Sequence, residues 1–168
     1  MSNGTTGRVV QISVNPKGGV PKYRVESAQV VANGVVGDKQ RYTQVHGGPE
    51  RAVCIFSYEL IQELQGEGHP IDCGTTGENL TVSGIDWGHV KAGDQFHVGD
   101  EVQLEVTRYT SPCINISESF VDGRFMRLSQ KVHPGWSRVY TRVLRDGTIG
   151  EGDAVEWIAA ATAGSMPR

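Results

Sequence analysis

Apolar and polar residues alternate with a period of two along much of the chain, and the alternating runs are short. The runs are rich in β-branched residues and are bounded by glycine, proline or asparagine, which is typical of strands joined by tight turns. The 22 glycines are spread between these runs, and this favours many turns over one long linker. The predicted strands cover residues 9–14, 25–31, 52–56, 79–82, 94–98, 101–107, 137–144 and 154–158.

Two segments follow the helical period instead. Residues 58–65 place three apolar side chains on one face, and they follow a serine that can cap a helix and precede a glycine that can end one. Residues 120–132 show a weaker apolar stripe, which Gly123 interrupts. The pattern therefore predicts one clear helix and one weaker helix among many strands.

Pairs of glycine and aspartate mark several of the predicted turns. Gly99-Asp100 predicts a two-residue hairpin between neighbouring strands, and Asp146-Gly147 turns the chain again. Short strands at this spacing predict a mainly β fold, a closed or partly open β-barrel with a few short helices. We expect one domain over residues 1–158 and a flexible tail over residues 159–168, where small residues follow no period.

Composition and charge narrow the class of protein. The net charge of −3, with no cluster of lysine and arginine, argues against a nucleic-acid polymer as partner. The sequence shows no signal-peptide pattern and no apolar run of membrane-spanning length, so we expect a soluble, cytoplasmic protein without a membrane partner. The three cysteines have no C-x-x-C pair, which fits neither a disulfide framework nor a structural zinc site, and the five histidines lack zinc-ligand spacing.

Cys113 is the strongest candidate for chemistry. It follows Pro112 shortly after the predicted strand 101–107, and because proline ends a ladder, the thiol is presented outside regular hydrogen bonding. Such a thiol can act as a nucleophile, a sulfur carrier or a metal ligand, while the alternative is a small buried apolar side chain. Cys54 lies in an apolar run and Cys73 in a loop without a basic neighbour, and we interpret both as structural.

Two glycine loops precede this cysteine. In the first, successive glycines allow the backbone to approach a ligand, their N–H groups can surround an anion, and a nearby arginine can bind it. In the second, glycine is followed by an acid and an amide that can contact a polar ligand. Ordinary turns are the alternative in both cases. The candidate residues are His46, Gly47, Gly48 and Arg51 in the first loop and Glu78 and Asn79 in the second.

The order of these motifs is more specific than any one of them. The chain reads Gly37-Asp38, His46-Gly47-Gly48, Gly77-Glu78-Asn79-Leu80, Gly93-Asp94 and Pro112-Cys113 in succession, and it closes with Gly150-Glu151-Gly152-Asp153-Ala154-Val155. In this order the motifs resemble the MOSC domain family, named after the C-terminal domain of molybdenum cofactor sulfurases. The resemblance is to its small stand-alone bacterial members, and it runs from about residue 7 to residue 158.

The resemblance implies a barrel-like fold and a molybdenum cofactor of the molybdopterin type. In some relatives the thiolate that matches Cys113 is thought to ligate molybdenum, and in others it is described as carrying a persulfide. Reducing members act on N-hydroxylated compounds. The resemblance also implies a cofactor contact for Asn79, and the group near His46 and Arg51 would suit the cofactor's phosphate.

One departure from the family concerns the residues before the cysteine. Many bacterial members have Arg-x-Pro-Cys, whereas this chain reads Thr110-Ser111-Pro112-Cys113. Arg108 lies two residues before Thr110 and would share its face on a strand, so a long guanidinium could reach the same space. We therefore keep Arg108, together with Ser111, as a candidate cofactor contact.

The resemblance implies a molybdenum-cofactor-binding protein that uses Cys113 as a metal ligand and reduces N-hydroxylated compounds. The chain has no dinucleotide fingerprint and no cysteine set for an iron–sulfur cluster, so this hypothesis implies a separate reductase as electron donor. We expect no pyridoxal phosphate site. Two alternatives stay open: a persulfide sulfur carrier that acts on the cofactor or another acceptor, and a non-catalytic module that binds an anion or a pterin.

Overall fold

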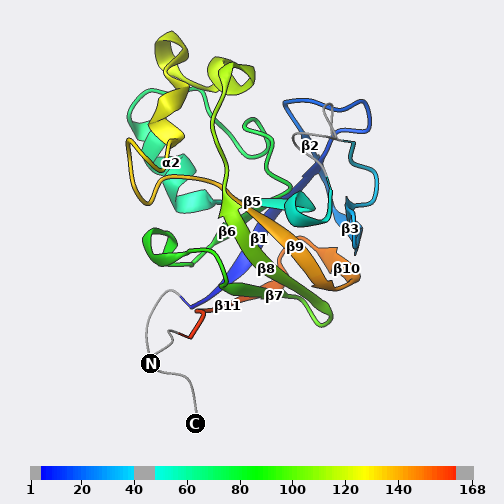
Figure 1. The fold of residues 1–168 in the computed structure, drawn as a ribbon. Coiled ribbons are helices and arrows are strands. Elements are labelled where there is room, and N and C mark those ends of the chain that lie inside the picture. The colour runs from blue at the N-terminus through cyan, green and yellow to red at the C-terminus, as the bar shows by residue number, and fades with distance from the viewer. Residues whose placement is uncertain (1–4, 40–47, 162–168) are drawn as a thin grey trace.

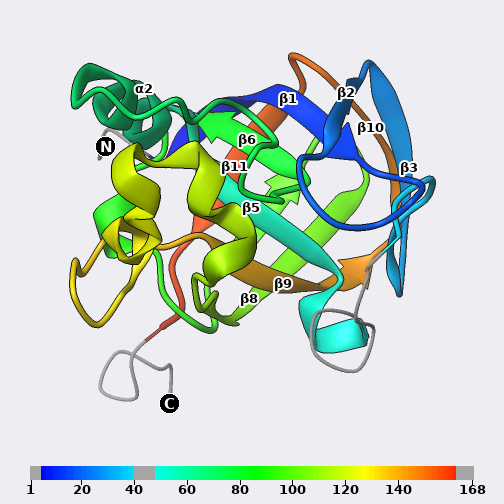
Figure 2. The same ribbon diagram turned by 90° about the horizontal axis from the view of Figure 1, so that it is seen from above.

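The computed structural model describes residues 5–39 and 48–161 of the chain. Within these residues, seven strands close into a barrel in the order β1-β11-β7-β8-β9-β5-β6, because β11 pairs with both β7 and β1 (Figures 1 and 2). The predicted β-barrel is therefore confirmed. The barrel strands are β1 (Thr6–Val14), β5 (Val53–Ser57), β6 (Leu80–Ser83), β7 (Gln95–Val98), β8 (Val102–Tyr109), β9 (Val139–Arg145) and β11 (Ala154–Ile158).

β1 is the strand on which closure depends. Its first residues pair with β11, its middle pairs with β6, and its last residues pair with β2 (Tyr23–Val25), which extends the sheet. The register with β6 shifts between Val9 and Gln11, and such a bulge bends and twists a strand. β1 is longer than the predicted strand 9–14, since the additional residues at its start pair with β11.

The parallel pair β5–β6 requires a crossover, and the helix α2 (Tyr58–Gly66) supplies the first part of it. The Ser57 hydroxyl accepts a hydrogen bond from the Leu60 N–H at 3.3 Å and caps the helix. Ile61 and Leu64 point into the core and are fully buried. The helix predicted over residues 58–65 is thus confirmed, including its cap.

A second, smaller sheet lies beside the barrel, next to β9 (Figure 1). It contains β3 (Ser27–Val31), β4 (Gly34–Val35) and β10 (Gly147–Gly150), in the order β10-β3-β4. The predicted strand 25–31 is therefore wrong as a single element, because the chain leaves the barrel sheet after β2 and joins another. The chain does turn at Asp146, but the residues after it form β10, which the sequence pattern did not predict.

The predicted helix over residues 120–132 is wrong. This region contains two 3₁₀ turns, η4 (Val121–Gly123) and η5 (Phe125–Leu128), and a third, η3 (Ile114–Ser119), directly precedes it. Asp122 and Gly123 adopt φ angles of 55° and 66°, and a left-handed pair cannot continue a right-handed helix. The segment is attached to the loop after α2 by a hydrogen bond from Ser119 Oγ to Thr75 Oγ1 at 2.9 Å.

Alternate residues of β7 and β8 are buried, as the period of two predicted. The hairpin between them is confirmed, although its loop has three residues, because Val98 pairs with Val102. Trp87 in η2 (Trp87–His89) adds to the core, since its ring stacks on Phe96 with the centroids 6.1 Å apart. Among the described residues, no helix is long and apolar enough to span a membrane.

A substitution at Gly7 tests how closely β1 approaches the end of β6 and the turn that follows it. A Cβ on Gly7 would lie 1.7 Å from the carbonyl oxygen of Ser83, so Gly7→Ala must displace the backbone of one of the two strands. We expect Gly7→Ala to lower the free energy of unfolding by about 1–3 kcal/mol or more in a urea titration. Gly66→Ala is the control, because open space surrounds Gly66 and alanine favours the helix. An equal loss in both variants would contradict the close approach.

Candidate functional site

Cys113 lies in the chain segment that leaves the barrel after β8. The strand ends at Tyr109, and Cys113 then stands directly before η3 with an extended backbone. The thiol is half-buried and is not in a disulfide. It is therefore held at the end of a barrel strand, where a ligand from solvent can reach it.

The neighbouring barrel strands β5, β9 and β8 place three residues side by side on the outer surface of the barrel. Cys54 on β5 lies opposite Tyr140 on β9, and Tyr140 lies opposite Arg108 on β8. Residues directly opposite one another in antiparallel strands point to the same face of the sheet. We call this surface the Tyr140 face. Cys54 is buried there, whereas Arg108 is exposed.

Arg51 reaches the same face from the turn before β5. It ends η1 (Pro49–Arg51), and its guanidinium carbon lies 5.7 Å from the centroid of the Tyr140 ring. This distance is typical of a cation–π contact, which fixes the guanidinium and leaves its N–H groups able to donate. The turn is anchored to β8, since the Thr107 hydroxyl donates to the carbonyl of Glu50 at 2.6 Å.

A second arginine, Arg138, lies on the same face but is buried, with 7 % of its surface exposed. Its Nη1 donates to the carbonyl of Thr76 at 2.5 Å, while its Nε is buried without a hydrogen-bond partner among the described residues. The hydroxyl of Thr110, which is 3 % exposed, is also buried without a partner there. Neither residue was a candidate in the sequence analysis.

Charged groups on and beside the Tyr140 face act on the hydroxyl of Tyr140. Burial raises the pKa of the Tyr140 hydroxyl to about 12, and negative charge on Cys54 or Cys113 acts in the same direction. The cations Arg138 and Arg51 oppose this shift. Tyr140 therefore stays protonated at neutral pH and lies within electrostatic reach of both thiols and both arginines.

The other two cysteines are poor nucleophiles. Burial raises the pKa of the Cys54 thiol to about 12 and that of the Cys73 thiol to about 11. Since the thiolate is the reactive form, both side chains are unreactive at neutral pH. This agrees with the interpretation of Cys54 and Cys73 as structural.

Glu78 is completely buried, and its carboxylate accepts hydrogen bonds within its own loop. The donors are Gly74 N at 3.0 Å, Thr76 Oγ1 at 2.8 Å and Thr81 Oγ1 at 3.2 Å. Burial raises the pKa of Glu78, although these hydrogen bonds and Arg138 act against the shift. Glu78 thus shapes the loop that presents the Thr76 carbonyl to Arg138.

Asn79 is equally buried and is engaged on both sides of its amide. Its Oδ1 accepts from the N–H of Cys54 at 3.1 Å, and its Nδ2 donates to Ser13 O at 3.2 Å and Asp38 Oδ2 at 2.8 Å. Asn79 therefore fixes the backbone of β5 behind the Tyr140 face. Its contact with a cofactor stays a prediction.

The remaining predicted residues divide into two groups. His46 and Gly47 lie outside the described residues, whereas Gly48 is exposed with a φ of 94°, a conformation that favours glycine. Ser111 is exposed beside the thiol.

The structure thus gathers Cys113, Arg51 and Arg108 around the Tyr140 face and places Glu78 and Asn79 beneath it. The alternation along residues 137–144 placed Arg138 and Tyr140 on one face, but it did not show that this face adjoins Cys113.

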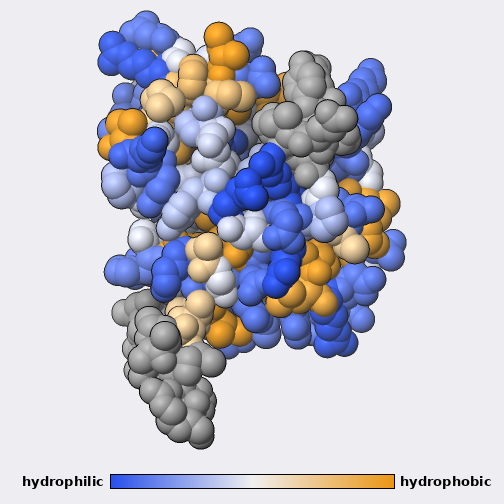
Figure 3. Space-filling view, in the orientation of Figure 1, coloured by the Kyte–Doolittle hydropathy of each residue, from blue (hydrophilic) through white to orange (hydrophobic). Residues whose placement is uncertain are grey.

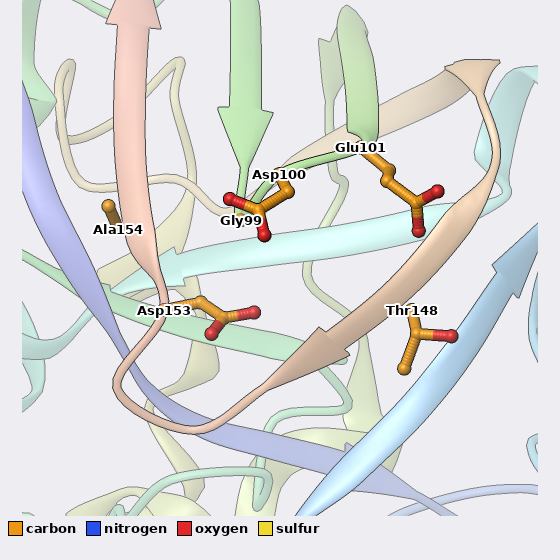
Figure 4. Close-up of a pocket in the computed structure, with 6 residues that line it drawn as sticks. All are labelled: Gly99, Asp100, Glu101, Thr148, Asp153 and Ala154. Atoms are coloured by element: carbon orange, nitrogen blue, oxygen red, sulfur yellow. The ribbon is translucent and has the colours of Figure 1, made fainter.

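A pocket of about 530 Å³ lies elsewhere on the barrel. It is lined by Asp100, Glu101 and Asp153 at the turns before β8 and β11 (Figure 4). The eight residues of β8 separate this pocket from the cysteine segment by roughly 25 Å. Among the described residues, no three His, Cys, Asp or Glu side chains are placed to hold a metal ion, here or elsewhere. The pocket is acidic and repels anions, whereas the candidate site at Cys113 adjoins a face that bears Arg51 and Arg108.

Comparison with known proteins confirms the family suggested by the sequence motifs. A family model described as MOSC domain matches residues 42–156. The chain is 32 % identical over 127 residues to the Uncharacterized protein YflK of Bacillus subtilis, covering 73 % of this chain and 55 % of that protein. It is 33 % identical over 129 residues to a protein of Gibberella moniliformis named Reductase, covering 74 % of this chain and 22 % of that protein.

Protein YiiM of Escherichia coli is 28 % identical over 137 residues, which are 78 % of this chain and 61 % of YiiM. The chain thus spans less than two thirds of the length of each of these relatives. Among solved structures, the YuaD protein of Bacillus subtilis superposes with a TM-score of 0.72 at 19 % identity, covering 93 % of this chain and 97 % of YuaD. The structure of E. coli YiiM gives a TM-score of 0.68 at 20 % identity, with 96 % and 72 % coverage. These likenesses show the fold.

The buried Glu78 predicts a pH dependence of stability. A carboxyl whose pKa is raised by folding binds its proton more tightly in the folded state, so its contribution is full below the unfolded pKa of about 4.3 and is lost as the pH rises towards the folded pKa. Glu78→Gln keeps the neutral shape and removes this titration. We expect its free energy of unfolding to fall less than that of the wild type between pH 4.5 and pH 7, measured by urea titration.

Glu67→Gln is the matched control for this prediction. The hydrogen bond from Arg127 lowers the pKa of Glu67, so that carboxylate contributes stability that is lost as the pH falls, the opposite sign. Parallel pH curves for the wild type and Glu78→Gln would contradict the raised pKa of Glu78.

Proposed function

The chain belongs to the MOSC domain family, and from this premise we propose that it is a molybdenum-cofactor-dependent oxidoreductase that reduces N-hydroxylated compounds. In this proposal the Cys113 thiolate is the protein's ligand to molybdenum. The observation that carries the proposal is the half-buried thiol at the edge of a face that bears Arg51, Arg108 and Arg138.

The donor set fits such a cofactor. A single thiolate cannot hold a bare metal ion, and the described residues offer no cluster of three ligands. A molybdenum-pterin cofactor carries its own sulfur ligands, so one soft thiolate from the protein suffices as a further ligand. Its phosphate is an anion, and arginine is well suited to bind a phosphate. Arg51 and Arg108 would hold that charge beside Cys113.

When bound, the cofactor supplies the two-electron chemistry that removes the hydroxyl oxygen from the substrate nitrogen. The residues of the chain bind, orient and supply protons. Tyr140 keeps its hydroxyl proton at neutral pH and is a neutral hydrogen-bond donor. The cation–π contact with Tyr140 would keep Arg51 in place to bind the cofactor's phosphate.

The electrons come from a separate reductase in this proposal. The support is that the relative named Reductase is much longer, since the match covers only 22 % of it. Its remaining length can accommodate further domains. The present chain, by contrast, carries neither a dinucleotide fingerprint nor an iron–sulfur cysteine set. A partner protein would therefore serve as donor.

Elemental analysis tests the role of Cys113. We expect the wild type, produced in a host that makes the cofactor, to contain molybdenum near one atom per chain, and Cys113→Ser to lose at least ~90 % of it. Loss of the soft ligand is the reason. Cys73→Ser is the matched control, since it removes the other half-buried free thiol and should retain the metal. Reduction of an N-hydroxylated base, with a chemical electron donor, should follow the metal content.

Two outcomes would contradict the proposal. Equal molybdenum in the wild type and Cys113→Ser would show that the thiolate is no ligand. Metal-free wild type with a sulfane sulfur that disappears in Cys113→Ser would favour the persulfide carrier. Both proteins must show the same cooperative unfolding, so that loss of metal cannot come from loss of fold.

A further inference from the structure

Two polar atoms near Cys113 are buried without a partner among the described residues: Nε of Arg138 and Oγ1 of Thr110. Their residues are 7 % and 3 % exposed. Polar groups buried this deeply are normally hydrogen-bonded, because an unmade bond leaves the loss of hydration uncompensated. Each such group in a native protein therefore requires an explanation, and two together point to one cause.

The two residues lie opposite one another. Thr110 N–H donates to the carbonyl of Arg138 at 3.0 Å, which extends the β8–β9 pairing one step beyond Tyr109 and Val139. Residues opposite one another in an antiparallel pair have Cβ atoms about 5 Å apart on the same face. This is the Tyr140 face, and Thr110 precedes Cys113 by three residues.

The charge of Arg138 also lacks a counter-ion. Within the described residues Arg138 forms no ion pair, and its neutral partner is the carbonyl of Thr76. Glu78 is hydrogen-bonded within its own loop and acts on Arg138 from a longer distance. A guanidinium stays charged at all relevant pH values, so a buried one requires an anion to compensate its lost hydration.

We propose that Arg138 and Thr110 form an oxyanion subsite beside Cys113, in which Arg138 Nε–H and the Thr110 hydroxyl donate to an anionic oxygen of a phosphate or similar oxyanion. Where that phosphate belongs to the cofactor, the inference rests on the proposed function. The subsite itself does not, because it is defined by two donors that have no partner among the residues that the structure describes. Figure 3, in the orientation of Figure 1, shows hydrophilic residues at the centre of this face of the molecule, whereas Arg138 and Thr110 themselves are buried.

The buried positive charge of the subsite comes from the β9 side of the strand pair. Thr110 carries no charge, and Arg108 is exposed and lies outside this buried layer. Arg138 lies opposite Thr110 and brings a guanidinium to that place from β9.

Phosphate binding and thermal stability test this subsite together. In calorimetric titrations of the full chain without cofactor, inorganic phosphate should bind the wild type, and Thr110→Val should weaken binding about 10-fold, the effect of one hydrogen bond. Without phosphate, Thr110→Val should raise the Tm by roughly 2–4 °C, because it removes an unpartnered hydroxyl. A merely structural hydroxyl would give a lower Tm and unchanged binding, which would overturn the proposal.

Matched controls come from the same structure. Thr141→Val removes a buried hydroxyl that donates to Val53 O at 2.9 Å, so it should lower the Tm and leave phosphate binding unchanged. Arg138→Met should abolish phosphate binding, whereas Arg24→Met, which removes an arginine paired with Glu151, should not. Thr110→Val keeps the test valid if Arg138→Met does not fold. No phosphate binding by the wild type would overturn the subsite.

Molybdenum content then identifies the source of the phosphate. Loss of molybdenum in Arg138→Met, made in a cofactor-producing host, supports binding of the cofactor's phosphate. Unchanged molybdenum with lost phosphate binding supports a free oxyanion. Phosphate binding by a wild type that never acquires molybdenum would contradict the proposed function while supporting the subsite.

Discussion

The buried carboxylate of Asp38 is the group on which the organisation of the site depends. A carboxylate taken out of water costs several kcal/mol unless it is paired and fully hydrogen-bonded. Lys22 Nζ contacts both of its oxygens, at 2.7 and 2.6 Å, and Asn15 N and Asn79 Nδ2 complete the shell at 2.8 Å each. Because Asn79 also binds the N–H of Cys54, the compensation of one charge fixes the end of β1, the loop before β6 and the strand behind the Tyr140 face.

The two sides of β5 and β9 therefore have different roles. One side of β5 and β9 fills the barrel, where Ile55 lies opposite Val139 and both are fully buried. The other side carries Cys54 and Tyr140, which are supported from beneath by the buried network. Side chains on such a face gain fixed positions from the barrel without being used to fill it.

The hydrophobic periodicity predicted the fold well because most barrel strands have a buried and an exposed side. Buried and more exposed residues alternate clearly along β7 and β8. It failed at residues 120–132, where an apolar stripe is present but Asp122 adopts a left-handed conformation that the pattern does not reveal. The candidate site was predicted from Cys113 because Pro112 marks a strand end. Arg138 was missed because its significance comes from pairing with Thr110 across the sheet, and that register is set by tertiary structure.

The pairing of β1 with β11 carries a consequence for folding. Thr6 lies opposite Glu156, so the ring closes only when residues from the two ends of the domain meet. Contacts between positions so distant in sequence are slow to form, because the entropy of closing a long loop is lost before the contacts stabilise the product. Until then β1 and β11 are open edges that can pair with other chains. The closed barrel is thus protected against aggregation, whereas the chain on its way to closure is exposed to it.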